Sequence, residues 1–141
     1  YYSEIQQKVG VSKLKKINKE RMKKILIVDD EPNIVMSLEY TFKKNNFQVF
    51  IARDGQEALD ILKNALPDLI ILDVMMPNVD GYNTLEQIKN DTRLKHTKVI
   101  FLSAKNKEKD IEKGLSLGAD LYMTKPFSVK KLVEHVNELT K

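Results

Sequence analysis

Three carboxylates follow two short apolar runs of this chain: Asp29 and Asp30 come directly after residues 25–28, and Asp73 comes directly after residues 69–72. Apolar runs of this kind are typical of buried strands in a parallel sheet, whose carboxyl ends meet at one edge. Carboxylates that are crowded together repel one another unless a cation lies between them. Oxygen ligands suit a hard divalent ion, so the spacing predicts a site for Mg²⁺ or Mn²⁺.

Two further polar side chains end apolar runs. Ser103 closes the run 99–102, and Lys125 follows the run 119–123. Each has an ordinary alternative role, because a serine often forms a turn and a lysine is usually a solvated surface residue; Asp30, just before Pro32, could equally be a helix N-cap. Together, however, four strands bring five polar groups to one crevice. Acids, a hydroxyl donor and a fixed cation are what transfer of a phosphoryl group to an oxygen requires.

The elements that position these groups alternate along the chain. Residues 47–51 form one more β-rich run, and helical patterns lie between the runs: residues 32–44, a segment from Asp54 (a capping-box-like start with Glu57) through Leu62, and residues 82–90, 106–117 and 128–139. The order βαβαβαβαβα predicts an α/β fold with a five-stranded, parallel, doubly wound sheet. Five strands and five helices fit residues 22–141 as one domain.

Composition limits the function classes. The chain has no cysteine, no apolar run long enough to span a bilayer and no signal peptide, so we expect a cytoplasmic protein without membrane insertion. Residues 1–21 hold six basic and two acidic side chains, which accounts for the whole net charge of +4. Residues 22–141 are neutral, so we expect no direct nucleic-acid binding. We interpret residues 1–21 as a linker, the tail of an upstream helix or a vector-derived segment, in preference to a functional arm.

Four blocks of this sequence resemble the response-regulator receiver domain of bacterial two-component signalling. They are residues 24–32, residues 67–77 with Asp80 and Gly81, residues 99–104 and residues 118–127, and the resemblance covers residues 23–141 in order. It implies a flavodoxin-like, CheY-like three-layer sandwich. It also implies a phosphoprotein that accepts a phosphoryl group on Asp73 from a sensor histidine kinase or a phosphotransfer protein.

The resemblance assigns roles to the other residues as well. Asp29 and Asp30 would hold Mg²⁺ together with Asp73 and the backbone carbonyl of Met75. Lys125 would pair with the acceptor carboxylate and then with the phosphoryl group, and a cis peptide would precede Pro126.

The switch residues are implied in the same way. Ser103 and the backbone of Ala104 would bind the phosphoryl oxygens, and Tyr122 would turn inward behind Ser103. The surface of about residues 106–139 would then change and control a partner or an output domain. The resemblance is also compatible with a homodimer that forms on phosphorylation.

Two positions next to the acceptor suggest slow hydrolysis. Met75 and Lys105 would flank the path of the attacking water, and the apolar methionine cannot orient that water. We therefore expect self-catalysed phosphotransfer and slow autodephosphorylation, and no turnover enzyme.

Three other functions fit this sequence less well. An aspartate-dependent phosphatase needs an acid two residues after its acceptor, where this chain has Met75. A dinucleotide-binding module needs a glycine-rich turn after the first strand, and none is present. A receiver-like interaction module that works without phosphate is disfavoured because every charged member of the site is kept.

Overall fold

The computed structural model describes residues 22–141, so the predictions for residues 1–21 lie outside the described part. One parallel sheet contains β1 (Lys24–Val28), β2 (Gln48–Ala52), β3 (Leu69–Leu72), β4 (Lys98–Ser103) and β5 (Leu121–Thr124). Their spatial order is β2-β1-β3-β4-β5. From β1 the chain winds outward to the edge strand β2 and then the other way through β3 and β4 to β5, which confirms the predicted doubly wound α/β class.

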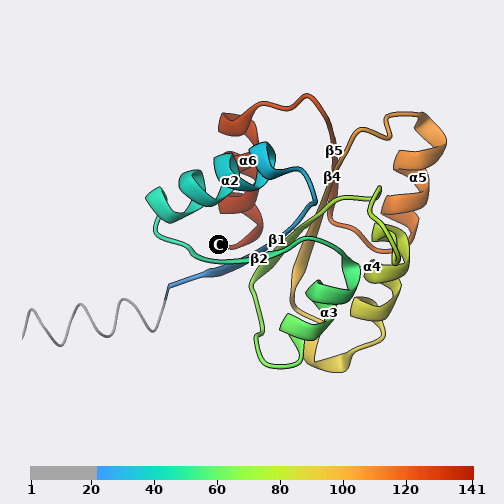
Figure 1. Cartoon of the computed structure of the whole chain (residues 1–141), viewed down its shortest axis with the longest axis horizontal. Helices are drawn as coiled ribbons and strands as arrows, with labels where there is room; N and C mark the ends of the chain where they lie inside the picture. The colour runs from blue at the N-terminus through green and yellow to red at the C-terminus, as the bar shows by residue number, and fades with distance from the viewer. Residues whose placement is uncertain (1–21) are drawn as a thin grey trace, which may run out of the picture.

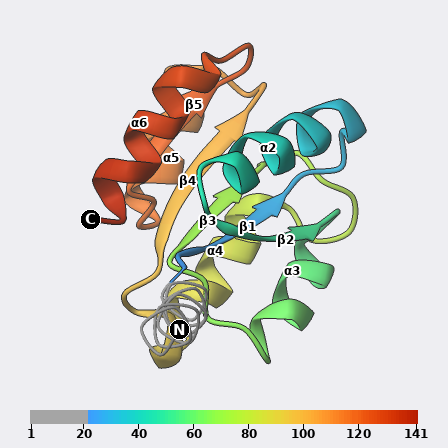
Figure 2. The same cartoon turned by 90° about the vertical axis from the view of Figure 1, so that its left-hand side faces the viewer.

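Helices cover both faces of this sheet. They are α2 (Pro32–Lys44), α3 (Gly55–Leu62), α4 (Gly81–Lys89), α5 (Glu108–Ser116) and α6 (Val129–Leu139). Helices α2 and α6 lie on one face and α3, α4 and α5 on the other, which gives three layers (Figures 1 and 2). A short 3₁₀ helix at Thr92–Leu94, which the sequence analysis did not predict, precedes β4.

The two faces of the sheet bury separate cores. Successive strand residues point to opposite faces, so Leu26 and Val28 pack in the core beneath α3 and α4, whereas Ile25 and Ile27 pack in the core beneath α2 and α6. All four side chains are fully buried. This double burial explains why the strand sequence is continuously apolar and does not alternate.

The helix starts test the capping predictions. Asp54 caps α3 by accepting the backbone N–H of Glu57 at 2.8 Å, as predicted. The alternative role of Asp30 as a cap is wrong, because Glu31 occupies the N-cap position of α2 and makes no side-chain cap hydrogen bond there. Helix α5 begins at Glu108, two residues later than predicted.

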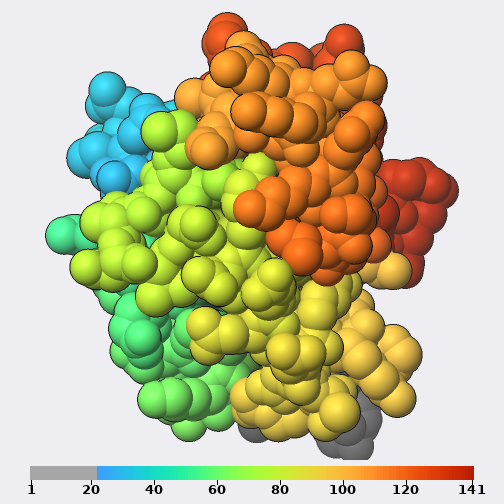
Figure 3. Space-filling view, turned by 90° about the vertical axis from the view of Figure 1, so that its right-hand side faces the viewer, coloured from blue at the N-terminus to red at the C-terminus, as the bar shows by residue number. Residues whose placement is uncertain are grey.

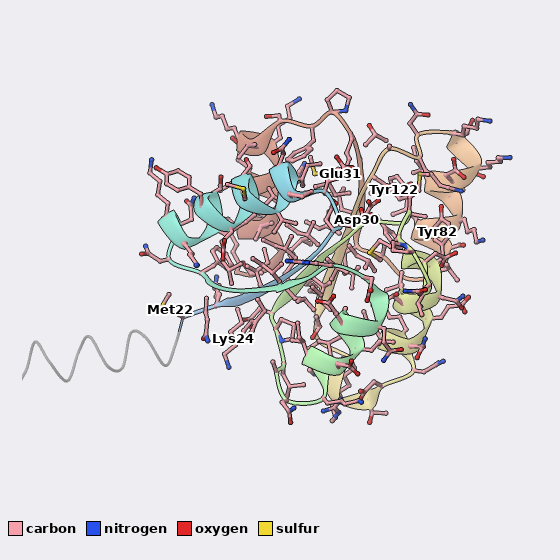
Figure 4. All side chains as sticks on the ribbon, in the orientation of Figure 1. Met22, Lys24, Asp30, Glu31, Tyr82 and Tyr122 are labelled. Atoms are coloured by element: carbon pink, nitrogen blue, oxygen red, sulfur yellow. The ribbon has the colours of Figure 1, made fainter. Side chains whose placement is uncertain are left out.

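The last predicted strand, residues 119–123, also begins later than expected. Asp120 instead binds the start of β4 with its own backbone and side chain, and β5 starts at Leu121. Figure 4 shows Asp30 and Glu31 beyond one end of the sheet and Met22 and Lys24 at the other. Within residues 22–141, no helix combines the length and apolar character needed to cross a membrane.

Candidate functional site

The backbone ladder of the sheet continues past the strands and fixes the polar residues that follow them. The N–H of Asp29 donates to the carbonyl of Ala52 at 3.1 Å, and the N–H of Asp73 donates to the carbonyl of Val28 at 3.0 Å. The N–H of Lys125 donates to the carbonyl of Ser103 at 2.8 Å. The predicted convergence at the carboxyl edge therefore has a direct cause, because each residue occupies the next rung of a parallel ladder.

The structure brings the three predicted acids together. Each of Asp29, Asp30 and Asp73 offers a carboxylate oxygen within 4.8 Å of the others. Asp29 and Asp73 are only 2% and 4% exposed, whereas Asp30 faces solvent. One oxygen of Asp29 accepts the N–H of Glu31 at 2.9 Å, and one oxygen of Asp73 accepts the N–H of Met75 at 3.2 Å.

Lys125 neutralises part of this charge. Its Nζ lies 2.9 Å from Asp29 Oδ2, 2.8 Å from Glu31 Oε1 and 3.4 Å from Asp73 Oδ2. The predicted pairing with Asp73 is therefore the longest of the three contacts. Glu31 is a partner that the sequence analysis missed, although its position next to two acids was a signal for an extra carboxylate.

Burial and charge act against each other in this cluster. Burial raises the pKa of Asp29 above its ordinary value, and the N–H of Glu31 and the ammonium of Lys125 only partly oppose that rise. For Lys125, burial alone would lower the pKa, but hydrogen bonds to Glu31 and Asp29 and the charge of Asp73 raise it well above its usual range. Lys125 is therefore a permanent cation at neutral pH.

The donor set suits a divalent ion. Three carboxylates, those of Asp29, Glu31 and Asp73, share Lys125. The three that converge, those of Asp29, Asp30 and Asp73, are hard oxygen ligands, and Asp30 is open to solvent. Such an arrangement fits Mg²⁺ or Mn²⁺, which keep part of their water shell when they bind proteins. The role of the Met75 carbonyl as a further ligand stays a prediction.

The switch residues lie beside the acids at the end of β4. Ser103 is fully buried, and its Oγ accepts the N–H of Lys105 at 3.2 Å, so it also forms the turn that its residue type suggested. Ala104 follows it in the exposed part of this turn. Tyr122 is half-buried; its hydroxyl donates to the carbonyl of Lys105 at 2.6 Å, and its ring lies 5.6 Å from that of Phe101.

Met75 and Lys105 line one pocket of about 460 Å³ whose other walls include Asp30 and Tyr82. Met75 is 55% exposed, and it shares this pocket with the exposed acid Asp30. In the space-filling view, the β3–α4 loop and α5 lie side by side on this face of the molecule (Figure 3). The Lys125–Pro126 peptide is cis, as predicted.

Comparisons with known proteins agree with this geometry. Residues 25–137 match the response regulator receiver domain family. Over 117 residues the chain is 43% identical to the alkaline phosphatase synthesis transcriptional regulatory protein PhoP of Bacillus subtilis; this covers 83% of the chain and 48% of PhoP. The chain thus spans about half the length of that relative.

Solved structures give the same result. The receiver domain of a signal transduction histidine kinase from Syntrophus aciditrophicus is 36% identical, with a TM-score of 0.78, over 84% of this chain and 89% of that one. The chemotaxis protein CheY4 of Vibrio cholerae is 29% identical, with a TM-score of 0.79, over 84% of this chain and 98% of that one. The fold is CheY-like, and the chain belongs to the response regulator receiver domain family.

Proposed function

We propose that Asp73 is the phosphoacceptor of this receiver domain. Receiver domains bind Mg²⁺ at an acidic cluster and act with histidine kinases and output domains, and this chain groups Asp29, Asp30 and Asp73. The observation that carries the proposal is the environment of the Asp73 carboxylate. One oxygen is held by the N–H of Met75, and the other faces the ammonium of Lys125. A buried carboxylate held in this way is an oriented nucleophile.

The reaction is phosphoryl transfer to a carboxylate oxygen. Asp73 forms a new O–P bond while the P–N bond of a phosphohistidine breaks, and the leaving imidazole keeps the electron pair and takes a proton. Asp29, Asp30, Asp73 and the carbonyl of Met75 would hold Mg²⁺. The ion would neutralise charge on the transferring oxygens. Lys125 would neutralise another oxygen, and Ser103 and the N–H of Ala104 would donate hydrogen bonds.

The product would act as a switch. A new dianion with strong acceptor oxygens favours the state in which the hydroxyl of Ser103 points toward it, and this state leaves room for the ring of Tyr122. Lys105 supports this coupling, because its N–H bonds the hydroxyl of Ser103 and its carbonyl bonds the hydroxyl of Tyr122. The affected surface would be α5, β5 and α6, which a downstream protein or an output domain would read.

The residue two positions after the acceptor favours a signalling role over turnover of a substrate. Met75 stands where an aspartate-dependent phosphatase needs its second acid. The chain would therefore catalyse only its own phosphorylation and dephosphorylation. We place this activity in the cytoplasm, which suits a chain without cysteine. The donor would be a sensor histidine kinase or a phosphotransfer protein.

Intact mass spectrometry tests the proposal directly. The protein is incubated with Mg²⁺ and acetyl phosphate, with and without excess chelator. We expect one added phosphoryl group in the wild type, and none in Asp73→Asn or in chelator, because unneutralised carboxylates repel the incoming dianion. Asp68→Asn is the matched control, since Asp68 directly precedes the same strand. We expect this variant to gain one phosphoryl group, as the wild type does. Wild-type modification of Asp73→Asn would refute the assignment, and a wild type that stays unmodified would favour the phosphate-independent interaction module.

A further inference from the structure

Tyr82 connects helix α4 to helix α5 through its ring and its hydroxyl. It is the second residue of α4, and only 6% of it is exposed. The hydroxyl donates to the carbonyl of Asp110, in the first turn of α5, at 3.0 Å. The Nζ of Lys113, one turn further along α5, lies 4.5 Å from the centre of the ring. A single side chain of α4 thus makes two different polar contacts with α5.

Tyr82 belongs to a row of three aromatic rings beneath α5. Its ring centre is 5.6 Å from that of Phe101, and Phe101 is 5.6 Å from Tyr122 on its other side. A Cβ atom at Gly114 would lie 2.8 Å from Tyr122 and 3.0 Å from Phe101, so the glycine lets α5 approach the row closely. Tyr82 and Tyr122, both labelled in Figure 4, lie at opposite ends of this row. Their hydroxyls bind two carbonyls of the same segment, those of Asp110 and Lys105.

The start of α4 lies directly on the backbone of the acceptor. The N–H of Gly81 donates to the carbonyl of Val74 at 2.9 Å. A Cβ atom at Gly81 would collide with the carbonyl oxygen of Asp73, so no side chain separates the two segments. A displacement of the backbone at Asp73 and Val74 would consequently reach Tyr82 through Gly81 alone. This route to α5 does not pass through Ser103.

We propose that Tyr82 is a second positioning residue of the switch, whose hydroxyl holds the first turn of α5 while Tyr122 holds the loop before it. The loop around Lys105 can then move with Ser103, while the bond to the carbonyl of Asp110 ties the first turn of α5 to α4 and limits how far α5 follows. The link to phosphorylation rests on the proposed function. The effect of the hydroxyl on α5 does not, because the contact is present in the protein as it stands.

Amide hydrogen exchange of Tyr82→Phe, without a phosphodonor, tests the hold on α5. The substitution keeps the ring and removes the hydroxyl, and we expect exchange in residues 108–116 to become roughly fivefold to tenfold faster while α6 is unchanged. The matched control is Tyr40→Phe, which removes a hydroxyl from an exposed tyrosine of α2 and should change nothing. Unchanged exchange in α5, or equal acceleration in α5 and α6, would overturn the proposal.

The same two variants and the wild type are then measured with Mg²⁺ and acetyl phosphate. In the wild type and Tyr40→Phe, the phosphate-dependent change in exchange should be smaller in α5 (residues 108–116) than in residues 103–107; in Tyr82→Phe the change in α5 should increase. An identical change in residues 108–116 of all three proteins would show that Tyr82 does not limit the response of α5. If intact mass shows no phosphorylation of the wild type, the proposed function fails, and the exchange without donor still decides the role of the hydroxyl.

Discussion

The two ends of the sheet use the same residue type in opposite ways. At the amino end, Asp68 and Asp120 are exposed, and each accepts a hydrogen bond from the backbone of a neighbouring strand, at 2.7 and 2.8 Å. At the carboxyl end, Asp29 and Asp73 are buried and share Lys125. The amino-end acids each satisfy one N–H, whereas the carboxyl-end acids carry more negative charge than the protein neutralises.

This difference teaches how to interpret an acid next to a strand. An acid that precedes a parallel strand can close the hydrogen-bond ladder and remain solvated, which contributes stability. An acid that follows the strand is carried by the next rung into a crevice between loops, where burial and repulsion cost stability. Asp68 and Asp73, at opposite ends of β3, are the clearest pair. The contrast between stability and function can be tested by identical substitutions at both ends.

Lys125→Met should produce the largest loss of stability. It leaves two buried carboxylates without their cation, so we expect the free energy of unfolding, measured by urea denaturation in chelator at neutral pH, to fall by about 3 kcal/mol. The matched change at the amino end is Lys24→Met, whose side chain makes no ion pair within residues 22–141 and should change stability by less than about 0.5 kcal/mol. Similar losses in the two variants would contradict the contrast between the ends.

A kinetic difference is expected at the rim of the carboxyl end. Met75→Asn, alone and together with Lys105→Glu, should speed hydrolysis of the acyl phosphate, because an amide or carboxylate can orient the attacking water. The decay after donor removal should be roughly tenfold faster, which corresponds to ~1.4 kcal/mol of activation free energy. A decay that is unchanged or slower would show that these two side chains do not control water access.

Removing one carboxylate charge should change the free energy of unfolding in opposite directions at the two ends of the sheet. In chelator at neutral pH, Asp29→Asn should raise the free energy of unfolding by about 1 kcal/mol, because it removes a buried like charge. Asp120→Asn should lower it by about 0.5 kcal/mol, because a charge-assisted hydrogen bond to Val99 becomes a neutral one. Urea denaturation of the two variants measures both changes, and a common sign would contradict the account.

The pH dependence of Asp29→Asn follows from the raised pKa of Asp29. A carboxyl whose folded pKa is raised binds its proton more tightly in the folded state, so its charged form destabilises the fold. The stabilisation of the fold by Asp29→Asn should therefore be complete above the folded pKa of Asp29. It should disappear as the pH falls to 3.8, the ordinary pKa of an aspartate. An advantage that grows toward low pH would reverse the assigned sign.

Much of the fold could be predicted because the runs that bury both faces of a strand are continuous and apolar. The helix 32–44 was predicted with its observed bounds, since Pro32 marks its start and two asparagines follow its end. The predicted start of β5 at residue 119 is wrong, because Asp120 accepts the N–H of Val99 in β4 with its side chain. No local sequence pattern reveals this tertiary contact. The 3₁₀ helix at 92–94 was missed for a similar reason, because the side chain of Arg93 binds carbonyls at the end of α3.

The convergence of the site could be predicted, but its detailed contacts could not. Acids after two strands imply one edge of a sheet, so the grouping of Asp29, Asp30 and Asp73 followed from topology. Which acid Lys125 contacts most closely depends on side-chain rotamers, and here Glu31 and Asp29 are closer than Asp73. The contact of Tyr82 with Asp110 joins two helices through residues that are 28 positions apart in the sequence, and no local pattern predicts it.

Mapping the modified residue tests the central claim most directly. After phosphorylation with Mg²⁺ and acetyl phosphate, borohydride reduces an acyl phosphate to an alcohol, so the acceptor aspartate becomes homoserine and tandem mass spectrometry locates it. We predict homoserine at position 73 alone, with Asp68 unchanged at the other end of β3. Homoserine at another acid, or phosphorylated protein that yields no homoserine at position 73, would contradict the account.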